Sequence, residues 1–169
     1  YHTGIEEFPL IDSNNILDAA KYAEQTDSDS IGIVTSGQGI SSSRDLRSIC
    51  TAIEKIAKNT HVHPHGSFAI LTRETAESLV KSGLTRLNHN LETSERFFPN
   101  VCSTHTFMDR INTIRCAREV GLEICSGAIF GIGEGIDDRI DLAFTLKMLD
   151  VDVVPLNFLH PISGTPLEN

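Results

Sequence analysis

The sequence predicts an α/β protein in which parallel strands alternate with helices. Apolar residues recur at helical spacing in several segments, and shorter strand-like runs separate these segments. The run from Val151 to Leu159 is nearly continuously apolar, which is typical of a parallel strand covered on both faces. Short connections favour right-handed strand–helix–strand units. About five such units fit into 169 residues, whereas a closed barrel takes about 250, so an open sheet and part of a barrel both stay possible.

The N-terminal third predicts two helices around one strand. Asp12 or Ser13 can cap the first helix, because short polar side chains accept hydrogen bonds from free helical N–H groups. A strand is expected over Ser30–Thr35, and a loop rich in serine and glycine follows it. Ser43 can cap the second helix, whose apolar residues at helical spacing are Leu46, Ile49, Ile53 and Ile56.

The middle of the chain repeats this alternation. We expect a strand around His61–His65 and then a helix capped by Thr72. A full capping box is not available there, because Thr75 stands three residues after the cap in place of an acid or amide. Gly83 ends this helix, and Leu84–Asn90 is expected to form the next strand.

The C-terminal part predicts two more helices and two more strands. A helix is expected from about Thr106 to Glu119, with Gly121 after its end. The next strand is expected over Leu122–Phe130. Asp137 can cap a further helix, which leads into the apolar run already described.

Composition sets limits on the class of protein. The apolar content of 40% and charged content of 22% indicate a globular chain, which we expect to form a single domain over residues 1–169. The net charge of −9 and the absence of a basic stripe argue against a nucleic-acid partner. No apolar run approaches the roughly 20 residues of a membrane span. The four cysteines form no C-x-x-C pair, so we expect reduced thiols and a cytoplasmic protein.

Polar residues gather where the expected strands end, which is where parallel α/β proteins bind ligands. Asn88, Asn90 and Glu92 share one face of an extended chain, because side chains alternate along a strand. Amides beside a carboxylate suit a ligand with hydroxyl and urea-like groups. Loop capping by the same side chains is the structural alternative.

Three further features near the strand ends could have a function or be purely structural. The glycines of Gly127–Glu134 could let the backbone approach a flat ligand, or could simply form a strand-to-helix turn. Arg110 could bind a carboxylate through two hydrogen bonds, or could face solvent. Cys125 could bind a metal, or could pack as a small apolar side chain.

A histidine-rich strand offers a different chemistry. His61, His63 and His65 would share one face of an extended strand and could hold zinc in a barrel hydrolase. Pro64 is expected to interrupt the pairing of this strand, and no carboxylate ligand stands nearby in sequence. The alternative is that these histidines pack or form hydrogen bonds.

Several ordered motifs together resemble the biotin synthase group of radical S-adenosylmethionine (SAM) proteins. They are GLTRLNHNLETS (83–94), CSTHTFMDR (102–110), GLEICSGAIFGIGE (121–134) and VPLNFLHPISGTPL (154–167). The opening YHTG is similar to the segment that follows this family's cluster-binding loop. The resemblance covers nearly the whole chain and is strongest from Gly83 onward.

The resemblance implies a TIM barrel, of which this chain would be the central part, roughly strands two to six. Members hold a 4Fe–4S cluster on a C-x-x-x-C-x-x-C loop and cleave SAM to a 5′-deoxyadenosyl radical. Biotin synthase then inserts sulfur from an auxiliary iron–sulfur cluster into dethiobiotin to make biotin, a reaction of biotin biosynthesis. The chain lacks the three-cysteine motif, so we expect it to be inactive alone.

The resemblance also implies roles for individual residues. Asn90 would contact both the SAM ribose and the ureido group of dethiobiotin, and Glu92 would bind the ribose where relatives often have a shorter Asp or Asn. Arg110 would pair with the SAM carboxylate. Ile129 would pack on adenine, and Asn157 would contact the ureido ring.

At the auxiliary cluster the chain departs from the family. Cys125 matches one of the three cysteine positions, whereas Gly32 and His65 occupy the other two. A related radical enzyme on another substrate, similar to methylornithine synthase or a hydrogenase maturase, therefore stays open. The histidine-strand hydrolase and a non-enzymatic binding domain are two further hypotheses. Unpaired strand edges in a partial barrel predict a homodimer, covered edges or aggregation.

Overall fold

The structure is a computed structural model that describes residues 9–36, 39–40, 42–165 and 167–168. The opening YHTG segment, with its resemblance, lies outside the described residues. Helices, strands and one 3₁₀ turn follow each other in the order α1 (Ser13–Gln25), β1 (Ser30–Val34), α2 (Ser43–Asn59), β2 (His63–Ser67), α3 (Arg73–Ser82), β3 (Arg86–Asn88), η1 (Phe98–Asn100), α4 (Phe107–Glu119), β4 (Glu123–Cys125), β5 (Ala128–Phe130), α5 (Ile136–Met148) and β6 (Leu156–Phe158).

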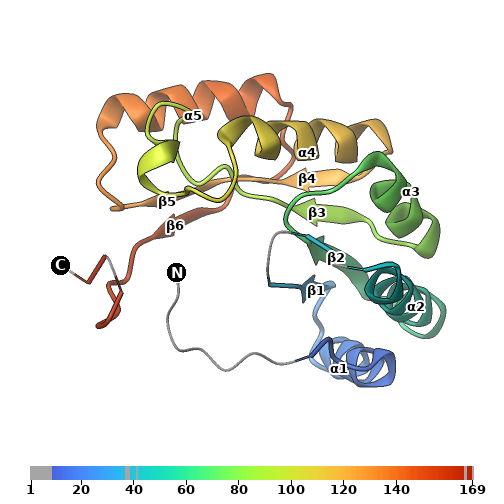
Figure 1. The fold of residues 1–169 in the computed structure, drawn as a ribbon. Coiled ribbons are helices and arrows are strands. Elements are labelled where there is room, and N and C mark those ends of the chain that lie inside the picture. Colours follow the sequence, from blue (N-terminus) through green and yellow to red (C-terminus); the bar gives the residue numbers. More distant parts are fainter. Residues whose placement is uncertain (1–8, 37–38, 41, 166, 169) are drawn as a thin grey trace.

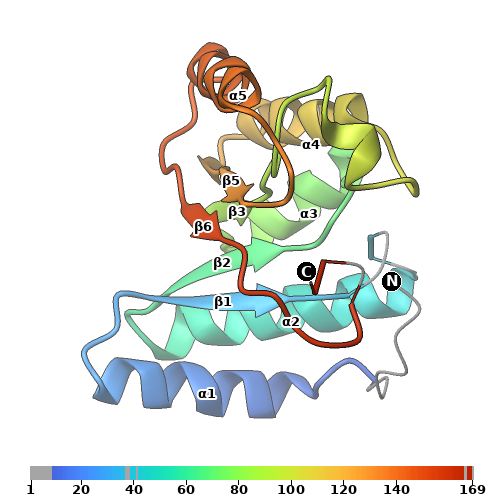
Figure 2. The ribbon, with the colours of Figure 1, turned by 90° about the vertical axis from the view of Figure 1, so that its left-hand side faces the viewer.

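Parallel pairing organises all of the described strands. One sheet has the order β1-β2-β3-β4, a second pairs β5 with β6, and every pair is parallel. Figure 2 shows β1 and β2 running in the same direction, with α1 and α2 side by side along them. The predicted alternation of parallel strands with helices is confirmed.

The two sheets belong to one curved row, because β4 and β5 form a single path with a bend at Gly127. Isolated bridges join Glu92 to Ala128 and Cys125 to Val153, so the row continues past the bend. An added Cβ at Gly127 would lie 1.8 Å from the carbonyl oxygen of Pro155, so only glycine allows this approach of two strands. Counted this way, the row has the five strands that the sequence predicts.

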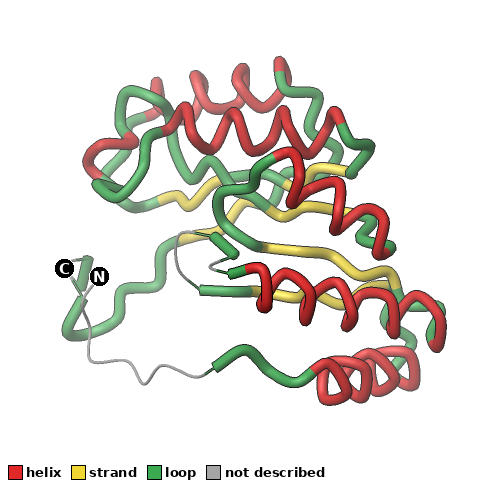
Figure 3. Tube along the Cα trace, turned by 45° about the vertical axis from the view of Figure 1, so that its right-hand side comes forward, coloured by secondary structure: helices red, strands yellow, loops and turns green. Residues whose placement is uncertain are grey.

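The helices cover one face of this row and leave the other open (Figures 1 and 3). The core lies between the two layers, and its strand residues include Ile33, Leu87 and Ile124. None of the described helices is long and apolar enough to cross a membrane.

The interpretation of Val151–Leu159 as a strand covered on both faces is wrong. Only Leu156–Phe158 forms a strand, and Phe158 is 76% exposed. β6 pairs with β5 alone, and no described helix packs over it, so its apolar residues stay in contact with solvent.

Helix starts show which cap predictions hold. Asp12 and Thr72 are N-caps, as predicted, and their side chains accept backbone N–H bonds. Thr106, which was expected only as the approximate start of a helix, is the N-cap of α4. The cap of α2 is Ser42 and not Ser43. Asp137 does not cap α5. The helix begins after Gly135, because Asp138 reaches back to accept the Gly135 N–H at 2.9 Å.

Pro64 does not interrupt its strand, contrary to the prediction. It pairs in register with Ile31, and its carbonyl accepts the N–H of Thr85 at 3.1 Å. The nitrogen and the carbonyl of Pro64 face the same side of the strand. Because the carbonyl already bonds Thr85, the nitrogen lies opposite residues that precede Arg86, where β3 begins. No ladder hydrogen bond is therefore lost there.

We predict that Gly127→Ala destabilises the fold, because the new methyl group collides with backbone that cannot rotate away. The expected loss is about 2–3 kcal/mol of unfolding free energy, measured by urea denaturation. Gly32→Ala is the matched control, since an added Cβ there meets nothing within 4 Å. Equal loss in both variants would contradict the close-approach argument.

Candidate functional site

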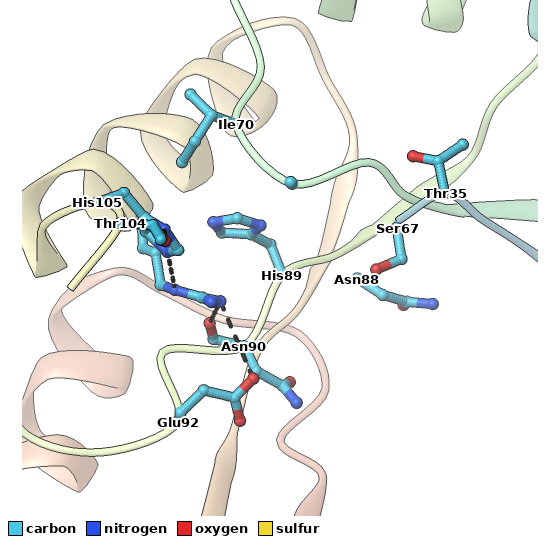
Figure 4. Close-up of a pocket in the computed structure, with 11 residues that line it drawn as sticks. Thr35, Ser67, Ile70, Asn88, His89, Asn90, Glu92, Thr104 and His105 are labelled. Atoms are coloured by element: carbon cyan, nitrogen blue, oxygen red, sulfur yellow. Dashed lines mark hydrogen bonds and ion pairs between the residues drawn. The ribbon is translucent and has the colours of Figure 1, made fainter. Parts of the chain in front are cut away.

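A cavity of about 480 Å³ opens at the carboxyl ends of β1, β2 and β3 (Figure 4). This volume is within the range of small-molecule sites. Thr35 and Ser67 reach it from the first two strands, and the N-terminal part of α4 closes the opposite wall. The last residue of β3, Asn88, and the segment after it contribute most of the remaining lining, the latter through His89, Asn90 and Glu92.

Backbone and side-chain bonds fix this segment against the neighbouring strand. The Asn90 Oδ1 accepts the Gly127 N–H at 3.0 Å. The Glu92 N–H donates to the Gly127 carbonyl, and the Glu92 carbonyl accepts the Ile129 N–H at 2.9 Å. These bonds hold Glu92 in the left-handed backbone region, with φ of 70°. The Glu92 side chain therefore does not follow the strand alternation from which its position was predicted, although it still lines the cavity.

Arg110 joins the wall of the cavity to the segment after β3. Its Nε donates to His105 Nε2 at 3.0 Å, and Nη1 donates to the Asn90 carbonyl at 2.6 Å. Its Nη1 also lies 3.9 Å from Glu92 Oε1. Because these two hydrogen bonds use only two of the five guanidinium N–H groups, Arg110 can still bind an anionic ligand.

Glu92 presents an unsatisfied carboxylate oxygen. Its Oε2 is buried and has no hydrogen-bond partner within the described structure. Burial raises the pKa of Glu92, against the opposing effects of the Arg110 charge and a hydrogen bond from Asn90. A buried acceptor without a partner is unfavourable, so a ligand hydroxyl that donated to it would be stabilising.

His89 is a cavity residue that the sequence analysis did not select. It is 5% exposed, and its Nε2 has no partner within the described structure. Burial lowers the pKa of His89 to about 3, and the charges of Arg110 and His105 act in the same direction. The side chain is therefore a neutral imidazole. Figure 4 shows its ring facing the space near Ile70 and His105. Alternation along the expected strand Leu84–Asn90 puts His89 on the face opposite to Asn88 and Asn90, so the pattern did not select it.

The structure brings Asn90, Glu92 and Arg110 together in the cavity. The two other residues predicted to contact ligands, Ile129 and Asn157, lie on the neighbouring strands. Ile129 is paired in register with Asn157 on β6, and its N–H bonds the Glu92 carbonyl. Asn157 is exposed, and neither residue lines the cavity itself. The five residues thus lie on adjoining segments, although their ligand contacts stay predictions.

His65 and Cys125 lie on the open face of the row of strands. His65 is in register with Gly32 on one side and Arg86 on the other. Burial is the main cause that lowers the pKa of His65 and raises the pKa of Cys125. Between them, Arg86 Nη2 lies 2.7 Å from Glu123 Oε2.

The histidine-strand hydrolase gains no support from this face. Within the described ranges, no three His, Cys, Asp or Glu side chains are grouped so that they could hold a metal ion. His61 precedes β2, which begins at His63, and therefore does not extend the row of ligands that the sequence analysis proposed.

Comparison with known sequences finds similarity to one family model and to individual biotin synthases. The model of the family described as "Radical SAM superfamily" matches residues 2–146. The chain is 46% identical over 169 residues to biotin synthase of Geotalea daltonii, covering 100% of this chain and 51% of the relative. It is 47% identical to biotin synthase of Thermotoga petrophila, covering 56% of that protein. The chain thus spans about half the length of the curated relatives it matches.

Solved structures show the same fold at low sequence identity. Methylornithine synthase matches 97% of this chain with a TM-score of 0.85 and 19% identity, over 48% of its own chain. The [FeFe]-hydrogenase maturase HydG matches 99% with a TM-score of 0.81 and 13% identity, over 40% of its chain. SuiB of Streptococcus suis, in a structure bound to S-adenosylmethionine, matches 95% with a TM-score of 0.72 and 14% identity, over 37% of its chain. The predicted partial TIM barrel is confirmed.

We predict that His89 makes the fold less stable in mild acid. Its pKa is about 3 in the folded chain, against 6.5 for a model histidine, so below pH 6.5 only the unfolded chain takes up this proton. Stability should fall as the pH decreases from 6.5 toward 3, by at most about 1.4 kcal/mol per pH unit from this group.

Urea denaturation of wild type and His89→Gln at several pH values between 7 and 4 measures this contribution. The variant should show a shallower loss of stability in acid. His63→Gln, at an exposed position on β2, is the matched control. If the unfolding free energy falls with decreasing pH at the same rate in wild type and in His89→Gln, the argument from burial is wrong.

Proposed function

The chain belongs to the radical SAM superfamily, and from this premise we propose that the whole protein is a biotin synthase. It would cleave SAM to a 5′-deoxyadenosyl radical and insert sulfur into dethiobiotin. Identity of 46% and 47% to curated biotin synthases over the whole chain supports this assignment. The chain corresponds to 51% and 56% of the length of these two relatives.

The observation that carries the proposal is the pairing of free donors and a free acceptor in one cavity. Arg110 keeps N–H groups for an anion, and Glu92 Oε2 has no partner among the described residues. A nucleoside that carries an amino-acid carboxylate supplies both complements: its carboxylate would bind Arg110, and its ribose hydroxyls would donate to Glu92. SAM is such a ligand, so these residues fit it.

Backbone geometry supports the roles proposed for the neighbouring residues. Ile129 is tied to Glu92 by a backbone bond, so an apolar surface for adenine would stand next to the ribose-binding carboxylate. Asn157 is in register with Ile129 and exposed, so its amide is free to bond a ureido group. Asn90 would contact both ligands from the segment between them.

The cluster that activates SAM would be held outside these 169 residues, which contain no C-x-x-x-C-x-x-C motif. A reduced 4Fe–4S cluster supplies the electron that cleaves SAM. The described residues would bind SAM, orient its carboxylate and ribose, and place the substrate beside it. We therefore propose that this chain alone binds ligands without turning them over.

An auxiliary cluster held by three cysteines does not fit the open face. Cys125 and His65 are available as ligands there, but Gly32 has no side chain, and an added Cβ would meet nothing within 4 Å. Arg86, which pairs with Glu123, is in register with His65, whereas Cys125 is in register with Asn88, so the two candidate ligands lie on different rows of the sheet. We derive no step of sulfur transfer through such a cluster.

This misfit favours a second candidate, a radical SAM enzyme that acts on another substrate. Glu92 also supports a different substrate, because its side chain is longer than the Asp or Asn that the family resemblance implies and extends further into the cavity. The fold of methylornithine synthase, with its TM-score of 0.85, shows that the architecture is compatible with other substrates.

We predict that Arg110→Gln weakens SAM binding by about 10- to 100-fold, because a charge-assisted bond contributes about 1.5–3 kcal/mol. Equilibrium dialysis with labelled SAM on the full-length protein carrying its cluster measures the affinity. Arg115→Gln is the control, since Arg115 is exposed on the same helix. Unchanged affinity in Arg110→Gln would remove Arg110 from the proposed site.

Product analysis of the same preparation separates the two candidate functions. Biotin formed from dethiobiotin supports the first. Reductive cleavage of SAM without biotin supports the second, and absence of both SAM binding and cleavage contradicts each of them.

We also propose that the isolated chain forms a homodimer through its uncovered apolar end. Phe144 and Met148 on α5 and Phe158 on β6 are 62%, 79% and 76% exposed. Figure 1 places α5 and β6 at the same end of the row of strands. Apolar surface of this kind favours association.

Sedimentation velocity at micromolar concentrations tests this association. The double variant Phe144→Asp/Phe158→Asp should sediment as a monomer, whereas wild type should sediment as a dimer. Tyr22→Asp, which changes an exposed aromatic residue on α1, is the control and should stay dimeric. A monomeric wild type would contradict the proposal.

A further inference from the structure

A cysteine–histidine pair stands at the mouth of the cavity, on the loop before α4. Cys102 Sγ lies 3.4 Å from His105 Nδ1 and 3.4 Å from Thr104 Oγ1. His105 and Thr104 line the cavity, and Cys102 lies directly behind them. The sequence analysis assigned no role to any of the three.

Arg110 determines which nitrogen of His105 carries the proton. The guanidinium Nε donates to His105 Nε2 at 3.0 Å, so Nε2 must be the acceptor. Burial and the Arg110 charge lower the pKa of His105, so the ring is neutral and its proton is on Nδ1. This Nδ1–H therefore points at Cys102 Sγ and Thr104 Oγ1.

The same surroundings favour the thiolate form of Cys102. Burial alone would raise the pKa of Cys102, but hydrogen bonds from the Thr104 side chain and from the Thr104 and His105 backbones, with the Arg110 charge, lower it overall. Cys116 and Cys125 differ, because burial raises the pKa of each. Cys102 is also partly exposed, so reagents can reach it.

We propose that Cys102 is a reactive thiol at the cavity mouth, and that modification of its sulfur displaces His105 and thereby moves Arg110. With a hydroperoxide, the thiolate attacks one peroxide oxygen and the O–O bond breaks. The sulfur becomes a sulfenic acid, and the second oxygen leaves as an alkoxide, or as hydroxide when the reagent is hydrogen peroxide. With an alkyl halide, a C–S bond forms and halide leaves.

The coupling to Arg110 follows from the lack of space. Cys102 Sγ is already within hydrogen-bond distance of the His105 ring, so an atom added to sulfur on that side must push the ring away. His105 also packs edge-on against Phe98 at 5.8 Å, and Arg110 lies over the same Phe98 ring at 5.6 Å. A displaced His105 therefore takes away the acceptor that holds Arg110 Nε. Because Arg110 is the proposed ligand of the SAM carboxylate, its movement would weaken SAM binding. This last consequence alone rests on the proposed function.

Alkylation rates within the folded chain test the reactivity. Iodoacetamide is added at neutral pH, and peptide mass spectrometry follows all four cysteines over time. Cys102 should react at least about tenfold faster than Cys116 and Cys125, which serve as internal controls in the same molecule. Equal rates, or a slower rate at Cys102, would overturn the proposal.

Two loop variants identify the cause of the reactivity. Thr104→Val removes the hydroxyl that stabilises the thiolate, so the pH at which Cys102 becomes reactive should rise. Ser103→Ala changes an exposed neighbour and should leave that pH profile unchanged. Identical profiles in Thr104→Val and wild type would remove the hydrogen-bond explanation and overturn the proposal.

Nitrogen-15 NMR of the Arg110 side chain tests the coupling without SAM. Complete carbamidomethylation of wild type should move the Arg110 Nε–H signal. The same treatment of Cys102→Ser should not move it. An unmoved signal in modified wild type would overturn the coupling, whether or not the protein binds SAM.

Discussion

The contact between Gly127 and the Pro155 carbonyl is the constraint on which the rest of the structure depends. It lets two strand segments approach closely enough for the row of strands to continue past the bend between β4 and β5. The same residue bonds the Asn90 side chain and the Glu92 backbone. Fold continuity and the geometry of the cavity therefore have a common origin, because a larger residue at Gly127 would disturb both.

Electrostatics of the cavity centre on one cation. Arg110 opposes the effect of burial on Glu92 and helps to keep His89 and His105 neutral. Burial is the largest cause of each pKa shift, and one guanidinium adds to it at two imidazoles and opposes it at a carboxylate that lines the same cavity. In a site shielded from water, such a fixed charge has more effect than it would at an open surface.

Local sequence signals predicted the elements well, and distant contacts explain where they did not. The caps Asp12 and Thr72 could be predicted because capping depends on neighbouring residues. The contact of Asp138 with the Gly135 N–H spans only three residues, so it is local, although the cap prediction selected Asp137 instead. The unsatisfied nitrogen of His89 depends on three-dimensional surroundings that no short pattern encodes. The motif that contains Asn90 and Glu92 predicted the cavity wall, whereas the contribution of His105 appears only once Arg110 of α4 joins it to the segment after β3.

The backbone conformation of Glu92 lowers the stability of the fold and at the same time places a carboxylate in the cavity. A residue with a side chain is disfavoured at φ of 70°, where glycine would be relaxed. The chain nevertheless keeps a carboxylate there, desolvated and with one oxygen free. A glycine here would relax the backbone but remove the carboxylate, so fold stability and ligand recognition make opposite demands on this one position.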